Sequence, residues 1–230
     1  MTVAENLARV RERVAAASAR VGRSPGEIRI VAVSKTQPPS AVVEAIAAGV
    51  DAIGENRVPE GAAKRPLAPG AVPRHLVGPL QRNKARQALV YFDLIETVDR
   101  PELADRIESL LAPLARVLPV FIEVNIGGEA QKSGAAPASS AALLEHLLAR
   151  CPHLRLEGLM TVPPYDPDPE RSRPHFAALR RLAAELASRF DAGPLALSMG
   201  MSEDFEVAVE EGAAWIRLGR VLFGERRAPA

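Results

Sequence analysis

The sequence contains few of the residues that mark several protein classes. With 230 residues it has one cysteine, so it cannot form an internal disulfide, and a reducing compartment such as the cytoplasm is compatible with this. Lys and Arg number 29 against 28 Asp and Glu, a balance that does not indicate a nucleic-acid or membrane surface. No segment stays apolar for the roughly 18 residues that a membrane span requires, and the N-terminus mixes charges throughout. We therefore expect a cytoplasmic protein that binds a small ligand, with neither nucleic acid nor membrane as a partner.

The four histidines do not form a metal-binding pattern. They show no zinc-ligand spacing with one another or with the single cysteine, the five residues being His75, His146, His153, His175 and Cys151. We therefore expect no metal site.

Short apolar runs alternate with helical segments along the chain. The strand candidates are residues 28–34, 52–54, 75–78, 93–98, 120–126, 156–160, 195–199 and 215–218. The first of these runs, IRIVAVS, lacks polar alternation, which is typical of a parallel strand that is covered on both faces. Helical periodicity is found between most of them, at residues 40–48, 101–111, 139–150, 174–190 and 203–211.

This alternation predicts an α/β fold, a single (β/α)₈ TIM barrel that spans residues 1–230. An open doubly wound sheet is the main structural alternative. An amphipathic helix precedes the first strand, because Leu7, Val10 and Val14 recur near helical spacing among charged residues. Residues 1–27 are accordingly an extra N-terminal helix and its lead-in.

Lys35 is the first candidate for chemistry. Ligands of α/β barrels bind at the C-terminal ends of the strands, and Lys35 directly follows the first apolar run. A lysine at a barrel mouth can form a Schiff base with an aldehyde when its pKa falls from about 10.4 towards neutrality. For a lysine taken alone, an ion-paired or solvated side chain is the simpler interpretation.

The segments after the seventh and eighth strands, SMGMSEDFE and RLGR, fit the phosphate site that recurs in this fold. Gly200 and Gly219 let backbone N–H groups approach an anion, and Ser198 and Ser202 offer hydroxyls. Ser202 can also cap the helix that follows it. Taken singly, these are turn residues and an N-cap. Together with a Schiff-base lysine they imply a phosphorylated aldehyde.

Arg217, near the end of the eighth strand, needs an acceptor because a buried unpaired charge is costly. A ring nitrogen of the ligand would serve, and so would a barrel carboxylate such as Glu55 or Glu123. If the ring is a pyridine, arginine keeps its nitrogen unprotonated, which weakens the ring as an electron sink. Glu123 and Asn125 either line the ligand site or fill the barrel.

Six motifs occur in order along the chain: AVSKTQP, IGENRVPE, HLVGPLQRNKAR, EVNIGGEAQKSG, LEGLM and LSMGMSEDFEVAVEEGAAWIRLGRVLFGER. Together they resemble the pyridoxal phosphate homeostasis proteins, and the match covers residues 5 to 226. The resemblance implies the fold of the alanine racemase N-terminal barrel, binding of pyridoxal 5′-phosphate, and no established catalytic activity.

The resemblance also implies roles for individual residues. Lys35 would form the Schiff base, Arg217 would face the pyridine nitrogen, and Lys132 of the KSG motif would assist cofactor transfer. The other implied cofactor contacts are Asn56 beside the ring and, around the phosphate, Ser198, Gly200, Gly219 and Arg220. Two positions depart from the family pattern: Arg74 replaces an aromatic residue, and Arg220 replaces a threonine, so a hydroxyl contact to phosphate gives way to charge or to a backbone N–H.

We expect a non-catalytic carrier that delivers pyridoxal phosphate to dependent apoenzymes, and the alternative is an amino-acid racemase. Racemisation needs a base on each face of the cofactor, usually the lysine and a tyrosine. Tyr91 is expected on the far side of the barrel, so only Tyr165 could approach the mouth. The chain ends at Ala230, and we expect no second domain, which favours the carrier and a monomer. A protein-interaction module is the third class considered, with the helix Ala4–Arg20 as its docking surface.

Overall fold

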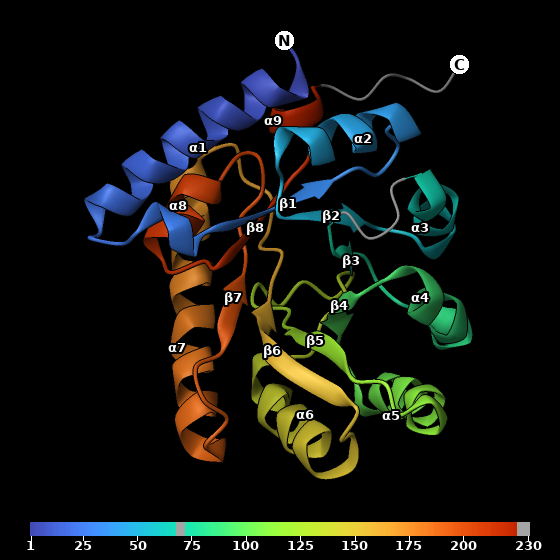
Figure 1. Ribbon diagram of the computed structural model, residues 1–230. Coiled ribbons are helices and arrows are strands. Elements are labelled where there is room, and N and C mark those ends of the chain that lie inside the picture. The colour runs from blue at the N-terminus through green and yellow to red at the C-terminus, as the bar shows by residue number, and fades with distance from the viewer. Residues whose placement is uncertain (68–71, 225–230) are drawn as a thin grey trace.

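The computed structural model describes residues 1–67 and 72–224, and in them parallel strands close into a barrel in the order β1 to β8 (Figure 1). The strands are β1 Arg29–Val33, β2 Ala52–Glu55, β3 Arg74–Leu76, β4 Leu94–Val98, β5 Leu118–Glu123, β6 Leu154–Met160, β7 Ala196–Ser198 and β8 Trp215–Leu218. Closure is direct, because Val31 of β1 pairs with Ala52 on one side and with Arg217 on the other. The predicted (β/α)₈ barrel is therefore confirmed and the open sheet is wrong.

Helices surround the barrel on its outside (Figure 1). They are α1 Val3–Arg20, α2 Pro39–Ala48, α3 Val58–Lys64, α4 Ala85–Tyr91, α5 Pro101–Leu111, α6 Pro137–Arg150, α7 Arg173–Phe190, α8 Phe205–Glu210 and α9 Arg220–Phe223. Short 3₁₀ turns cover Pro25–Glu27, Arg65–Leu67, Arg82–Lys84, Ala112–Leu114 and Pro169–Ser172. The extra N-terminal helix is confirmed by α1, which begins with a capping box between Thr2 and Glu5.

Three helices, α3, α4 and α9, were not predicted from the sequence. In α3, Pro59 and Gly61 weaken the helical pattern, but packing overrides propensity. A Cβ at Gly61 would come within 2.4 Å of Phe92, so the glycine lets α3 lie directly against that ring. Helices α4 and α9 have seven and four residues, too short for a periodic signal.

Apolar strand residues fill both faces of the barrel wall. Ile30 and Ala32 belong to the large core between strands and helices, whereas Val31 and Val33 belong to a separate cluster. Alternate residues of a strand point to opposite faces, so this second cluster lies inside the barrel. Burial on both faces explains why the first strand lacks polar alternation.

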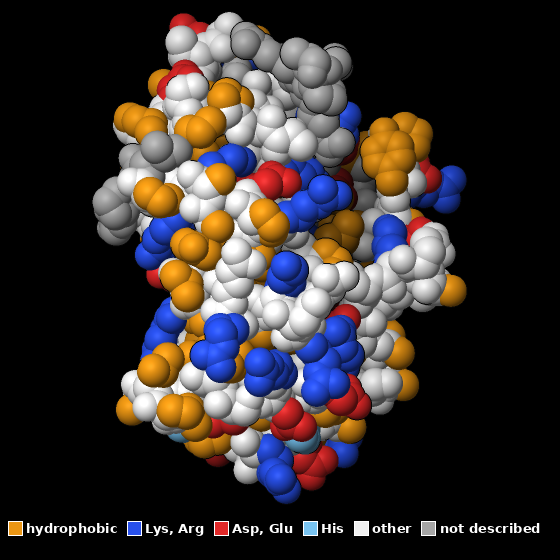
Figure 2. Space-filling view, turned by 90° about the vertical axis from the view of Figure 1, so that its right-hand side faces the viewer, with side chains coloured by type: hydrophobic (Ala, Val, Ile, Leu, Met, Phe, Trp, Pro, Cys, Tyr) orange, Lys and Arg blue, Asp and Glu red, His pale blue; other side chains and the backbone are white. Residues whose placement is uncertain are grey.

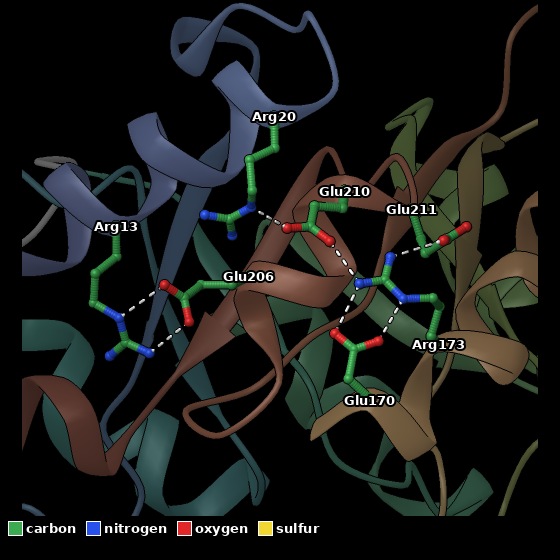
Figure 3. A network of polar contacts seen from close by, with 7 residues as sticks. All are labelled: Arg13, Arg20, Glu170, Arg173, Glu206, Glu210 and Glu211. Atoms are coloured by element: carbon green, nitrogen blue, oxygen red, sulfur yellow. Dashed lines mark hydrogen bonds and ion pairs between the residues drawn. The ribbon is translucent and has the colours of Figure 1, made fainter. Parts of the chain in front are cut away.

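Charged side chains link α1 to α8, and α8 to α7 (Figure 3). Arg13 of α1 pairs with Glu206 of α8 at 3.0 Å, and Arg20 pairs with Glu210 at 2.5 Å. Glu210 also accepts from Arg173 of α7 at 2.6 Å. Glu210 thus joins α1, α7 and α8 through Arg20 and Arg173, and this shared carboxylate fixes α1 better than an isolated surface pair would, whereas Arg13 and Glu206 form a separate pair.

The surface carries mixed charge on the face shown in Figure 2, where basic, acidic and hydrophobic side chains are interspersed. Among the helices of the described residues, none combines the length and apolar character needed to cross a bilayer.

Candidate functional site

A pocket of about 590 Å³ opens where the strands end, a volume typical of small-molecule sites. Five of the seven predicted cofactor contacts line it: Lys35, Asn56, Arg217, Gly219 and Arg220. These residues follow or end β1, β2 and β8, as expected for the C-terminal face of a barrel.

The backbone on both sides of Lys35 is fixed. Ser34 continues the ladder with an N–H bond to Gly54 at 2.9 Å, and its carbonyl accepts from Lys64 Nζ at 2.6 Å. Thr36 has a φ of 63°, a strained left-handed conformation for a β-branched residue, and its N–H donates to Glu60 at 3.1 Å. The half-buried Lys35 therefore leaves the strand in a set direction.

Glu55 is committed to the support beneath Lys35. Its Oε1 accepts from Lys64 Nζ at 2.8 Å and from the Ser34 hydroxyl. Burial raises the pKa of Glu55, and the hydrogen bonds from Lys64 and Ser34 oppose that rise. Glu55 is therefore not the partner of Arg217.

Arg217 is buried and held by three groups. Its guanidinium donates to the Ser198 hydroxyl at 2.8 Å and to the Thr161 carbonyl at 2.7 Å, and it lies 3.9 Å from Glu96. A barrel carboxylate lies beside Arg217, as the sequence allowed, but it is Glu96 and not Glu55 or Glu123. Burial lowers the pKa of Arg217, and the carboxylates of Glu96, Asp204 and Glu123 oppose this effect.

Glu96 is the hub of this network, and sequence reasoning missed it. It is fully buried in β4, and accepts from the Ser198 hydroxyl at 2.6 Å and contacts His75 Nδ1 at 2.7 Å. Burial alone would raise the pKa of Glu96, but His75, Arg217 and Ser198 hold it below its ordinary value. Glu96 lies inside the apolar run LIETV. The sequence alone does not show whether a single polar residue in such a run points into the barrel and has partners there or merely interrupts the run.

Ser198 and Gly200, the other two predicted phosphate contacts, do not line the pocket. Ser198 is fully buried and its hydroxyl is engaged by Glu96 and Arg217. Gly200 has a φ of 91°, and a Cβ there would come within 2.5 Å of the Ala208 Cβ. The structure thus gives Ser198 a place in the Arg217 network and makes Gly200 a packing position.

Ser202 takes their place in the pocket wall. Its hydroxyl accepts from the N–H groups of Gly219 and Val221, at 3.3 Å each, and so joins the segments after β7 and β8. It does not cap the following helix as predicted, because α8 begins at Phe205 with Asp204 at the N-cap position. We call Ser202, Gly219 and Val221 the serine–glycine turn.

Arg220 lies at the exposed rim beside this turn. Its guanidinium pairs with Glu203 at 2.6 Å, and its side chain is 54% exposed. The positive charge is therefore at the pocket edge, already matched by a carboxylate.

The opposite wall comes from β5 and the segments after β5 and β6. Glu123, Lys132 and Ser133 line it, and Lys132 Nζ donates to the Pro163 carbonyl at 2.9 Å. Tyr165 lies at this edge and is 72% exposed. The sequence singled out Glu123, Lys132 and Tyr165. Other residues that line the pocket were not singled out, among them Gln37, Gln131, Glu203 and Phe223. Gln37 could have been found by reading two positions beyond Lys35.

Asp105, His146 and Cys151 lie together on α5, α6 and the residue after α6, with possible ligand atoms within 4.8 Å of one another. The spacing of these residues in the sequence does not indicate this group. His146 Nε2 already contacts Asp105 at 2.7 Å. Burial raises the pKa of the Cys151 thiol to about 11, so the thiol keeps its proton.

Comparison with known proteins gives consistent results. The family model described as "Alanine racemase, N-terminal domain" matches residues 6–227. The "Pyridoxal phosphate homeostasis protein" of Pseudomonas aeruginosa is 42% identical over 228 residues, which cover 98% of this chain and 96% of that protein. PipY of Synechococcus elongatus, solved with pyridoxal phosphate bound, superposes with a TM-score of 0.83 at 36% identity and covers 97% of this chain and 100% of its own. An alanine racemase from Corynebacterium glutamicum, at 19% identity and a TM-score of 0.74, covers 97% of this chain and 61% of its own and is similar in fold.

Proposed function

We propose that this chain, which belongs to the pyridoxal phosphate homeostasis proteins of the alanine racemase N-terminal domain family, holds pyridoxal 5′-phosphate on Lys35 as a carrier without turning over a substrate. One observation carries the proposal. Lys35, Ser202 and Gly219 line the same pocket, so one ligand would meet both an amine and an anion site.

The residues present fit this cofactor. Its aldehyde supplies an electrophilic carbon, to which the Lys35 amine would bond with release of the aldehyde oxygen as water. The Ser202 hydroxyl and the backbone at Gly219 would hold the phosphate, with Arg220 at the rim, and Asn56 would lie beside the ring. Ser198 and Gly200 act behind this contact surface, as parts of the wall that support it.

Arg217 would limit the chemistry of the bound cofactor, and the racemase alternative would share this arginine at the ring nitrogen. A guanidinium at the pyridine nitrogen keeps that nitrogen unprotonated, and the ring is then a weak acceptor of electrons from a substrate carbon. Its bonds to Ser198 and Thr161 and its proximity to Glu96 hold the charge in place. The network therefore supports binding and disfavours carbanion chemistry.

A racemase is the competing function, and Tyr165 is the residue that would serve it. A second base must meet one face of the substrate carbon at a fixed position. Tyr165 lies at the pocket edge with a 72% exposed side chain, and Tyr91 ends α4 on the outside of the barrel. Neither tyrosine therefore lies where a second base could be held at a fixed position against the ligand.

The carrier proposal also concerns the recipients of the cofactor, the location of the protein and its oligomeric state. We infer delivery of the cofactor to pyridoxal-phosphate-dependent apoenzymes in the cytoplasm, by a monomer that uses neither nucleic acid nor membrane. Light scattering of the loaded protein checks the monomer, and a fixed dimer would contradict it. Transfer is checked by mixing the loaded protein with an apoenzyme and following recovery of that enzyme's activity.

The attachment site is tested by reduction with borohydride and peptide mass spectrometry of the loaded protein. We expect the adduct on Lys35, its loss in Lys35→Ala, and its retention in Lys132→Ala, a matched control because both lysines line the pocket. An adduct on another residue, or none, would overturn the proposal. Incubation with L- and D-alanine separates the two functions, because turnover at enzyme-like rates would establish the racemase.

A further inference from the structure

Glu123 is a pocket carboxyl that the proposed function leaves unused. It ends β5, lines the pocket with Lys35 and Arg217, and is only 6% exposed. Its Oε1 accepts from the Ser133 hydroxyl at 3.1 Å, whereas its buried Oε2 has no hydrogen-bond partner in the described part of the chain. Buried polar atoms are normally paired, so Oε2 needs an explanation.

The charged groups around Glu123 do not neutralise it. Asp99, after β4, and Arg217, in β8, act on it from a distance, and the ion pairs of the described residues do not include Glu123. Lys132, which lines the same wall of the pocket as Glu123, forms an ion pair with Glu129 and donates to the Pro163 carbonyl. Lys35 lines the same pocket from β1.

These surroundings decide the protonation of the carboxyl near neutral pH. Burial raises the pKa of Glu123 to about 7, the Ser133 hydrogen bond and Arg217 oppose the rise, and Asp99 adds to it. Pyridoxal phosphate brings negative charge into the pocket and excludes water from it. Both changes disfavour a carboxylate and favour the neutral acid, whose O–H is a donor.

We propose that Glu123 is a further ligand contact, which is neutral in the complex, takes up a proton from solvent where it was ionised before pyridoxal phosphate bound, and donates the O–H of Oε2 to an acceptor atom of the ligand. This inference rests on the proposed function, because it assigns a role toward the same ligand. It makes cofactor affinity depend on pH through one identified side chain.

The expected effect follows from proton linkage. A carboxyl with a pKa of about 7 is mostly neutral at pH 6 and mostly ionised at pH 8. Binding that requires the neutral form is therefore weaker by about 10-fold at pH 8 than at pH 6, with the affinity falling as the pH rises.

The test is the dissociation constant of pyridoxal phosphate, measured by absorption titration from pH 6 to 8 for the native chain and for Glu123→Gln. Protonation of the free ligand affects both proteins alike, so the ratio of the two constants removes it and reports the effect of the residue at position 123. We expect this ratio to rise about 10-fold with pH. Calorimetry in buffers of different ionisation enthalpy should show the extra proton uptake at pH 8 in the native chain alone. A constant ratio and equal proton uptake would overturn the inference.

A control is Glu145→Gln, which alters an exposed carboxyl that does not line the pocket. We expect it to keep the native pH profile. If Glu123→Gln does not fold, Ser133→Ala serves instead, because loss of the hydrogen bond that lowers the pKa should move the midpoint to higher pH. An unmoved midpoint contradicts the assignment.

The proposed function can fail separately from this inference. A missing Lys35 adduct in the reduced native protein refutes the carrier. A Lys35 adduct in both proteins, with parallel pH profiles, refutes only the role of Glu123.

Discussion

Replacement of Glu96 by glutamine tests the buried network that holds Arg217. The substitution keeps the shape of the side chain and removes its charge. Arg217 then loses the carboxylate 3.9 Å away, and His75 and Ser198 face an amide in place of a charged acceptor. Removing one partner of a buried ion pair typically costs about 3–5 kcal/mol, since the other charge stays buried.

That loss is large compared with the total stability of a domain, about 5–15 kcal/mol. For a domain of this size each kcal/mol lowers the melting temperature by about 2–4 °C, so Glu96→Gln should melt about 6–20 °C below the native chain. Urea titration and thermal melting of the ligand-free protein measure the difference. The exposed Glu145→Gln is the control, expected within about 0.5 kcal/mol of the native chain.

The dependence on pH gives the same experiment a second readout. Because the folded-state pKa of Glu96 lies below its ordinary value of 4.5, its stabilisation is present above that pH and is lost as the pH falls through the lower folded value. The difference in the free energy of unfolding between the native chain and Glu96→Gln should therefore become smaller at acid pH. A Glu96→Gln protein as stable as the control at neutral pH would refute the reasoning.

Three further predictions concern the scaffold. Gly200→Ala should destabilise the fold by about 2–5 kcal/mol in urea titration, because its Cβ meets Ala208 at a positive φ, whereas Gly193→Ala, with open space around it, should cost about 1 kcal/mol; equal losses would contradict the packing role. Arg173→Ala should cost about 1 kcal/mol at low salt and less at about 1 M salt, and a salt-independent loss would show that packing, not charge, is responsible. Cys151 should react slowly with a thiol reagent at pH 8 in the folded protein and rapidly in denaturant, because burial raises its thiol pKa to about 11; fast reaction in the native state would contradict this.

Most of the fold could be predicted from the sequence, because the strands are short apolar runs that alternate with longer helices. The short helices α3, α4 and α9 could not, since their stability comes from packing that only the tertiary structure supplies. The placement of Lys35 and Arg217 at one pocket followed from the rule that barrel ligands bind where strands end.

The wrong or missing predictions for residues of the site have one physical origin. The position of a residue after a strand does not say whether its side chain points into the pocket or into the wall behind it. Ser198 ends β7 and faces Arg217, and Ser202, four residues later, reaches the pocket. Glu96 was missed for the same reason, since an inward-facing carboxylate in an apolar strand has meaning only once its partners from β3, β7 and β8 are known.

The contact between α1 and α9 has a consequence for synthesis of the protein. The Asn6 side chain donates to the Leu222 carbonyl at 2.8 Å across 216 positions of sequence, and α9 directly follows Gly219 of the pocket. Helix α1 also packs on α2, but during translation the part of its apolar face that packs on α8 and α9 stays uncovered until those helices leave the ribosome. We therefore expect nascent chains halted before β8 to depend on chaperones and to have no affinity for the cofactor.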